Sequence, residues 1–152
     1  MNSTKDQFIE LLTNSINQPM SRAIMNNYRG ISPLMGQEIT YRANYETTQE
    51  LKSKKEIEKL WLAFTELFSK VKTNDFNPTL VYNQDKTLFE SYGAFDLKQF
   101  DAPKDKFNSI NQLLNYYYSK KIKLKKINKL TNKINNVITN DKENAYKKYK
   151  RI

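Results

Sequence analysis

The chain has 152 residues, which is enough for one ordinary domain or two small ones, and only 38% of them are hydrophobic, so any core must be modest. The sequence contains no Cys and no His, which excludes disulfides, thiolate or imidazole metal sites, and nucleophilic catalysis by Cys/His or Ser/His pairs. Its 26 Lys and Arg residues exceed its 16 Asp and Glu residues, which gives a formal net charge of +10.

The first 72 residues are expected to form a helical domain. Thr4 and Gln7 have capping-box spacing, so a first helix is predicted to begin there. A second helix is predicted from Pro19 to Gly30, because Pro suits a first helical turn and Gly commonly ends a helix. The side chains expected on the buried stripe of the first helix have helical spacing: Phe8, Leu11, Leu12 and Ile16.

A third helix is predicted to start at Ser32-Pro33, with Ser as the N-cap, and to bury a stripe that ends at Tyr41. The tight link 29–32 then makes a helix-hairpin-helix unit. A glycine hairpin followed by a helix N-terminus can bind phosphate, because both present backbone N–H groups. The alternative is that Gly30 only ends one helix and Ser32 only begins the next. The candidate phosphate-site residues are Arg29, Gly30, Ser32 and Arg42.

The segment 53–71 carries the strongest amphipathic pattern in the chain and is predicted to be the main core helix, starting at a capping box of Ser53 and Glu56. Its aromatic residues Trp61, Phe64 and Phe68 suit either a ligand-binding box or core packing, and their helical spacing favours the core.

Residues 73–108 are expected to form a connector that contains a short β-hairpin. The runs 79–82 and 87–92 are rich in β-branched and aromatic residues and flank a turn-forming segment. Gly93 and Pro103 predict a loop after them. An isolated hairpin is marginally stable, so it is expected to pack on the helices or on strands that this chain lacks.

Residues 109–152 are predicted to form one long basic helix that provides half of a coiled coil, with Ser109 and Gln112 as a further capping box. The segment 119–152 holds twelve basic residues and two acidic ones, so the first 118 residues are neutral. Lys120, Thr131 and Asp141 interrupt its heptad seam. The apolar residues that follow the seam are Ile110, Leu113, Tyr117, Leu124, Ile127, Ile134 and Ile138. The complete architecture is therefore expected to be mainly α: a helix-hairpin-helix bundle (1–72), a hairpin connector (73–108) and a coiled-coil arm (109–152).

This arm suits an RNA backbone, because lysines that neutralise phosphates release counterions. The alternative is a solvated helix whose lysines only keep it soluble. The tyrosines 116–118 suit either stacking on bases or packing on the hairpin. The lysines considered as candidate RNA contacts are Lys120, Lys121, Lys123, Lys125, Lys126, Lys129 and Lys133.

Membrane insertion and catalysis are not indicated. No stretch approaches the ~18 apolar residues of a membrane span, and the N-terminus has no signal-peptide pattern, so a cytoplasmic protein is expected. Glu56, Glu58 and Glu66 share their predicted helix with lysines, which is typical of surface pairing rather than acid-base catalysis. We therefore expect no enzymatic activity, no cofactor and no metal.

The run RGISPLMGQEITYRA at 29–43 resembles the helix-hairpin-helix segment of the bacterial fibronectin-binding protein A family, also called the NFACT family. The later order of elements is similar too: a long amphipathic helix, Asn77-Pro78 before a strand, three tyrosines and a lysine-rich arm. The resemblance implies that the chain is a fragment of a larger protein. Members of the family carry a lobe before this region, and they carry a second coiled-coil strand and an RNA-binding domain after it.

The resemblance also implies a function. Family members bind obstructed large ribosomal subunits and tRNA, and they support template-free tailing of stalled nascent chains. An older family name describes a surface adhesin that binds fibronectin or fibrinogen, which is the alternative expectation for partner and location. A third hypothesis is an enzymatic one, by analogy with DNA glycosylases that contain a helix-hairpin-helix unit. Only a similarity of fold supports it.

Overall fold

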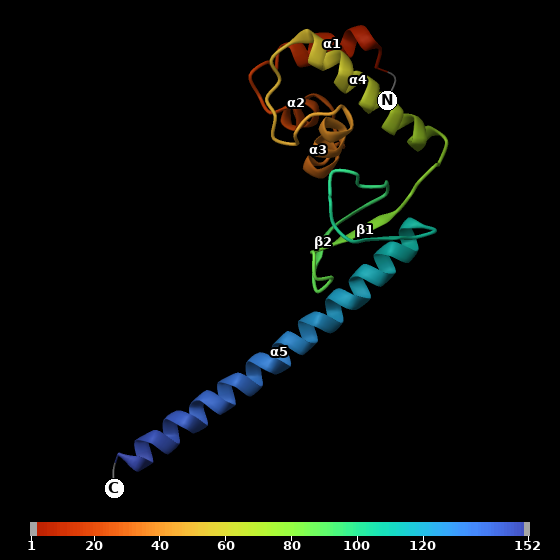
Figure 1. Cartoon of the computed structure of the whole chain (residues 1–152). Coiled ribbons are helices and arrows are strands. Elements are labelled where there is room, and N and C mark those ends of the chain that lie inside the picture. The colour runs from red at the N-terminus through yellow and green to blue at the C-terminus, as the bar shows by residue number, and fades with distance from the viewer. Residues whose placement is uncertain (1–2, 151–152) are drawn as a thin grey trace. The chain divides into compact units, whose positions relative to one another are not determined.

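The computed structural model describes residues 3–150, and these divide into two compact units, one up to residue 109 and one from residue 110. The fold is mainly α, with a small antiparallel sheet and a long C-terminal helix, as predicted (Figure 1). The first unit contains α1 (Lys5–Thr13), α2 (Met20–Asn27), α3 (Pro33–Arg42), α4 (Lys54–Lys72), β1 (Thr79–Tyr82), β2 (Phe89–Gly93) and β3 (Lys104–Lys106), and the second contains α5 (Ile110–Tyr149).

The predicted starts of α1, α3 and α4 are confirmed by their caps. Thr4 and Gln7 form the reciprocal capping box of α1. Ser32 Oγ accepts a hydrogen bond from Met35 N at 3.2 Å at the start of α3, with Pro33 in the first turn. The Glu56 carboxylate accepts from Ser53 N at 2.9 Å at the start of α4. These bonds satisfy N–H groups that have no partner inside the helix.

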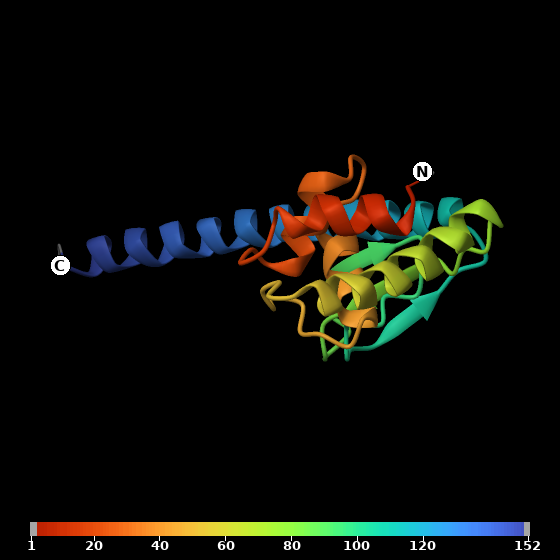
Figure 2. The same ribbon diagram turned by 90° about the horizontal axis from the view of Figure 1, so that it is seen from above.

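The core of the first unit lies among α1 to α4, and Phe8 is at its centre. α1 packs against α4, and α2 packs against α3 (Figures 1 and 2). The ring of Phe8 lies 5.6 Å from Tyr28, 5.2 Å from Trp61 and 5.0 Å from Phe64, measured between ring centroids. One aromatic cluster therefore joins α1, α4 and the residue that ends α2.

Some expected core positions are wrong. Leu11 and Ile16, expected on the buried stripe of the first helix, are 38% and 37% exposed, and Ile16 lies beyond the end of α1 at Thr13. Tyr41, expected on the buried stripe of α3, is 44% exposed, whereas Glu38 and Thr40 are completely buried. The buried face of α3 is rotated from the apolar stripe because the Glu38 carboxylate accepts hydrogen bonds from the backbone N–H groups of Lys98 and Gln99.

Gly36 allows α2 and α3 to approach closely. A Cβ atom at this position would lie 2.7 Å from the backbone oxygen of Ser21. Gly36→Ala is therefore expected to destabilise the protein by about 1–3 kcal/mol, despite alanine's better helix propensity. Denaturant unfolding measures the loss, with Gln37→Ala on the same helix as control. A Gly36→Ala protein as stable as the wild type would contradict this packing.

β1 is the central strand of a three-stranded antiparallel sheet with the order β2-β1-β3. β2 starts two residues later than predicted, because Asn83 Oδ1 accepts hydrogen bonds from Thr87 N and Leu88 N and holds both residues in the turn. The expectation of a two-stranded hairpin followed only by a loop is wrong. β3, which belongs to the same chain, occupies the other edge of β1 and pairs Lys106 with Thr79.

α5 is one continuous helix of 40 residues, which corresponds to a length of about 60 Å. It begins one residue after the predicted capping position Ser109, and the capping box there remains a prediction. Among the helices of residues 3–150, none combines the length and the apolar character that crossing a membrane requires.

Candidate nucleic-acid interface

The link between α2 and α3 begins earlier than predicted, because α2 ends at Asn27 and not at Gly30. Tyr28 ends α2 in an extended conformation, and Gly30 has φ of +89°, a region that favours glycine. Ser32 then caps α3. Arg29, Gly30 and Ser32 are all exposed, so the structure brings three of the four predicted hairpin-site residues together on one surface.

The fourth predicted residue, Arg42, lies at the opposite end of α3, and its side chain is only 4% exposed. Its Nε donates to Glu38 Oε1 at 2.7 Å, and its Nη2 donates to the backbone oxygen of Asp96 at 2.7 Å. Its Nη1 lies 3.6 Å from Glu66 Oε1. The guanidinium is therefore used inside the fold and offers no surface donor to a phosphate, contrary to our expectation for this residue.

Glu38 is the centre of this buried cluster. Its carboxylate also accepts hydrogen bonds from Lys98 N at 3.0 Å and Gln99 N at 3.1 Å. Sequence reasoning missed this cluster, although the spacing of Glu38 and Arg42 by four residues on one helix was a signal for an ion pair. The pair joins α3 to the segment between β2 and β3, and so positions the sheet on the helical bundle.

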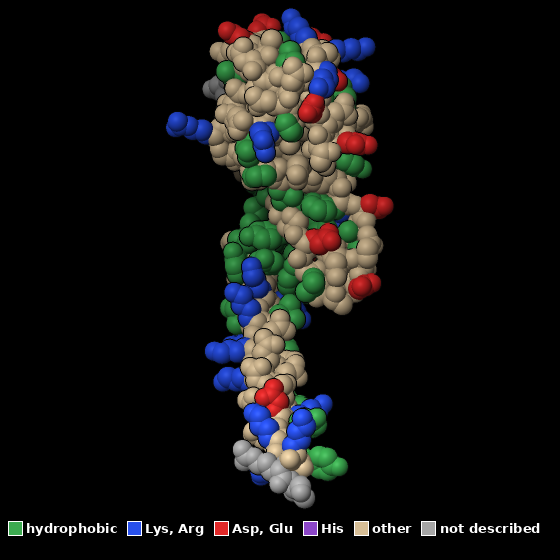
Figure 3. Space-filling model, turned by 90° about the vertical axis from the view of Figure 1, so that its left-hand side faces the viewer, with side chains coloured by type: hydrophobic (Ala, Val, Ile, Leu, Met, Phe, Trp, Pro, Cys, Tyr) green, Lys and Arg blue, Asp and Glu red, His purple; other side chains and the backbone are tan. Residues whose placement is uncertain are grey.

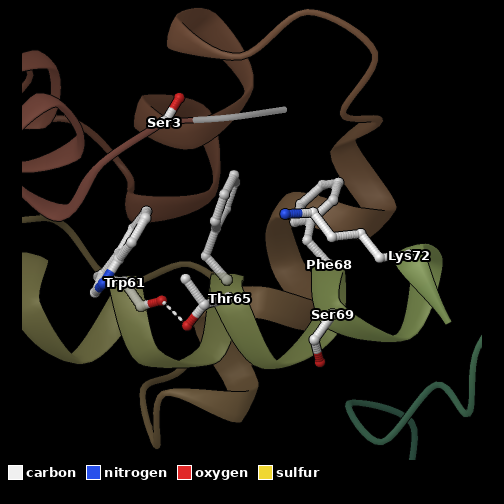
Figure 4. Close-up of a pocket in the computed structure, with 7 residues that line it drawn as sticks. Ser3, Trp61, Thr65, Phe68, Ser69 and Lys72 are labelled. Carbon is white, nitrogen blue, oxygen red and sulfur yellow. Dashed lines mark hydrogen bonds between the residues drawn. The ribbon is translucent and has the colours of Figure 1, made fainter.

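A hollow of about 350 Å³ lies on the outer side of the core, along α4 (Figure 4). The hydroxyls on this face donate to the helix backbone: Thr65 Oγ1 to Trp61 O, and Ser69 Oγ to Glu66 O. Phe64 belongs to the core as the helical spacing predicted, whereas Trp61 and Phe68 are only partly buried. The hollow is lined by Ser3, Trp61, Phe64, Thr65, Phe68, Ser69 and Lys72.

The predicted RNA-contacting lysines are all exposed along α5, and Figure 3 shows Lys and Arg side chains projecting along the extended helix. No Asp or Glu occurs between residues 107 and 140 of the sequence, so this stretch of α5 contains basic side chains and no acidic ones. Lys120 lies over the ring of Tyr116 and Lys121 over that of Tyr117, at 5.6 and 5.1 Å from the centroids. The seven candidate lysines are therefore all accessible, and they are distributed around the circumference of α5 between exposed apolar side chains.

The family model for the NFACT N-terminal and middle domains matches residues 1–152. The chain belongs to the NFACT family. This result confirms the resemblance that the hairpin segment and the order of elements indicated.

A solved structure with a similar fold is that of the fibrinogen binding protein from Staphylococcus aureus, with a TM-score of 0.52 and 21% sequence identity. The similarity covers 70% of this NFACT chain and only 37% of the S. aureus protein. At this identity the similarity shows a shared fold. No significant match was found among curated protein sequences.

Proposed function

We propose that this NFACT chain is a non-enzymatic RNA-binding module that associates with the large ribosomal subunit and tRNA, in support of the tailing of stalled nascent chains. The observation that carries the proposal is the set of exposed lysines on α5, in a stretch with no acidic residue from 107 to 140. Family membership supports the choice of partners.

The charge distribution explains why α5 is the proposed contact. The first 118 residues are neutral, so long-range attraction of a polyanion depends on the arm. Within the described residues, Lys125, Lys126, Lys129 and Lys133 form no salt bridge, and all four remain free to neutralise phosphates. Arg29, Gly30 and Ser32 are proposed as a second, smaller phosphate contact that helps to orient the module.

Binding is therefore expected to be strongly salt-dependent. If the seven candidate lysines each neutralise one phosphate, log K should fall against log salt with a slope of about −5 to −6, which means roughly a 10³-fold loss between 50 and 200 mM salt. Filter binding of the full chain to tRNA and to large ribosomal subunits measures this slope. Absence of binding at low salt, or an affinity that salt does not change, would contradict the proposal.

A second candidate is fibrinogen binding at the cell surface, which the name of the S. aureus fibrinogen binding protein of similar fold favours. This candidate requires a surface location. Fractionation that finds the protein only in the cytoplasm argues against it and agrees with the ribosome-associated proposal.

A further inference from the structure

α5 has two chemically different sides. At 100° per residue, one side carries an exposed apolar stripe, and four exposed lysines lie on the remaining surface, with Lys126 beside the edge of the stripe. The apolar stripe consists of Leu124, Ile127, Leu130, Ile134, Val137 and Ile138, and the lysine face consists of Lys125, Lys126, Lys129 and Lys133.

A row of asparagines runs beside the lysine face. Every fourth residue from 128 to 140 is Asn, so four amides lie along one side of the helix, and all four are exposed. Lys125, Lys129 and Lys133 form a parallel row with the same spacing, offset by one position. The asparagine row consists of Asn128, Asn132, Asn136 and Asn140.

Neither row serves the stability of α5 itself. Like charges four residues apart repel each other on a helix, and asparagine is a poor helix former. The arrangement does suit an external partner that offers negative charge next to groups that both donate and accept hydrogen bonds. The Lys ammonium provides the charge, and the Asn amide both donates and accepts.

We infer that the lysine face and the asparagine row together bind the sugar-phosphate backbone of double-helical RNA, the lysines at phosphates and the asparagines at 2′-hydroxyls. This inference rests on the proposed function and specifies its RNA partner. Double-helical RNA presents 2′-hydroxyls in a wide, shallow minor groove with phosphates along its edges, and proteins recognise it by shape rather than base sequence. The two rows extend over about 22 Å from 125 to 140, which suits a contact across a groove.

Whether RNA binds the lysine face of α5 is tested with two lysine variants of the full chain that have the same net charge. The first is Lys129→Gln/Lys133→Gln, and the control is Lys142→Gln/Lys148→Gln, which changes two lysines that lie on the side of the apolar stripe and are not among the seven candidate RNA contacts. Gln keeps a similar helix propensity. With an RNA duplex of about 16 base pairs as probe, the first variant should lose affinity on the order of tenfold, with a salt slope shallower by about 2. The control should lose much less, and equal losses in the two variants would overturn the assignment to this face.

The asparagine row is tested by comparing that RNA duplex with a DNA duplex of the same sequence. The wild type should prefer RNA by roughly tenfold, because only RNA offers the 2′-hydroxyl. The variant Asn128→Ala/Asn132→Ala/Asn136→Ala/Asn140→Ala should lose this preference and keep its affinity for DNA. Equal binding of RNA and DNA by the wild type would overturn the inference.

Two further outcomes separate this inference from the proposed function. Binding to the RNA duplex through this face, without binding to large ribosomal subunits or tRNA, supports the inference and contradicts the proposed function. If the chain binds large ribosomal subunits and both lysine variants weaken this binding equally, the result supports the proposed function and contradicts the inference. Tighter binding to vesicles of anionic lipid than to the RNA duplex would identify a membrane surface as the partner and overturn the inference.

Discussion

Replacing Phe8 with alanine is expected to lower the free energy of unfolding of the first unit by about 3–5 kcal/mol. Phe8 is completely buried, and its ring contacts Tyr28, Trp61 and Phe64 with centroid distances of 5.0 to 5.6 Å. Loss of this ring removes its contacts with two residues of α4 and with the residue that follows α2, and it leaves a cavity that the surrounding helices cannot fill. Native domains have only about 5–15 kcal/mol of stability, so this substitution would remove a substantial part of the total free energy of unfolding.

Trp61 makes this measurement specific to the first unit. It is the only tryptophan of the chain and lies 5.2 Å from Phe8, so its fluorescence during denaturant unfolding reports on the aromatic cluster. Leu62→Ala is the matched control, because Leu62 is on α4 next to Trp61 but is 69% exposed. Its expected effect is within about 0.5 kcal/mol. If Phe8→Ala were as mild as Leu62→Ala, Phe8 would not be the centre of the core.

Replacing Glu38 with alanine is expected to cost about 3–5 kcal/mol, because it leaves the buried guanidinium of Arg42 without its main counter-charge. The backbone N–H groups of Lys98 and Gln99 lose their acceptor as well. Unfolding by denaturant measures the stability, and the amide NMR signals of Lys98 and Gln99 report whether the segment 96–99 detaches from α3.

Glu66→Ala is the control, because it removes one negative charge near Arg42 without removing a buried carboxylate. Glu66 also faces Arg42, at 3.6 Å, but its side chain is 58% exposed, so its loss should cost less than about 1 kcal/mol. The double variant Glu38→Ala/Arg42→Met removes both buried charges and should recover part of the stability. Equal effects of Glu38→Ala and Glu66→Ala would show that the buried ion pair does not hold the segment 96–99.

The stability and binding predictions concern different parts of the chain. Phe8 and Glu38 act on the first unit, whereas the lysine face and the asparagine row lie on α5. A variant that unfolds the first unit is therefore a poor test of RNA binding, and the lysine variants should leave the Trp61 signal of unfolding unchanged. Measuring both readouts on each variant separates a damaged fold from a lost contact.

Sequence reasoning was accurate where the signal is local. The capping positions Thr4 and Ser32 and the long helix α5 depend on residues within one or two turns, and the structure confirms them. It failed for β3, because Lys104-Asp105-Lys106 has no β-branched or aromatic residue. That strand forms because β1 offers an unpaired edge, and Asp105 also accepts a hydrogen bond from Tyr82 Oη at 2.6 Å.

The same distinction between local signals and tertiary contacts applies to the candidate site. The sequence by itself determined the order of helices, the glycine hairpin and the concentration of positive charge after residue 118, because helical periodicity, caps and charge are properties of neighbouring residues. Only the tertiary structure decided the role of Arg42, since its partner segment 96–99 is more than 50 residues away along the chain. A charged residue that sequence reasoning assigned to phosphate binding is buried, because a carboxylate four residues earlier and a distant backbone oxygen together replace its contacts with water.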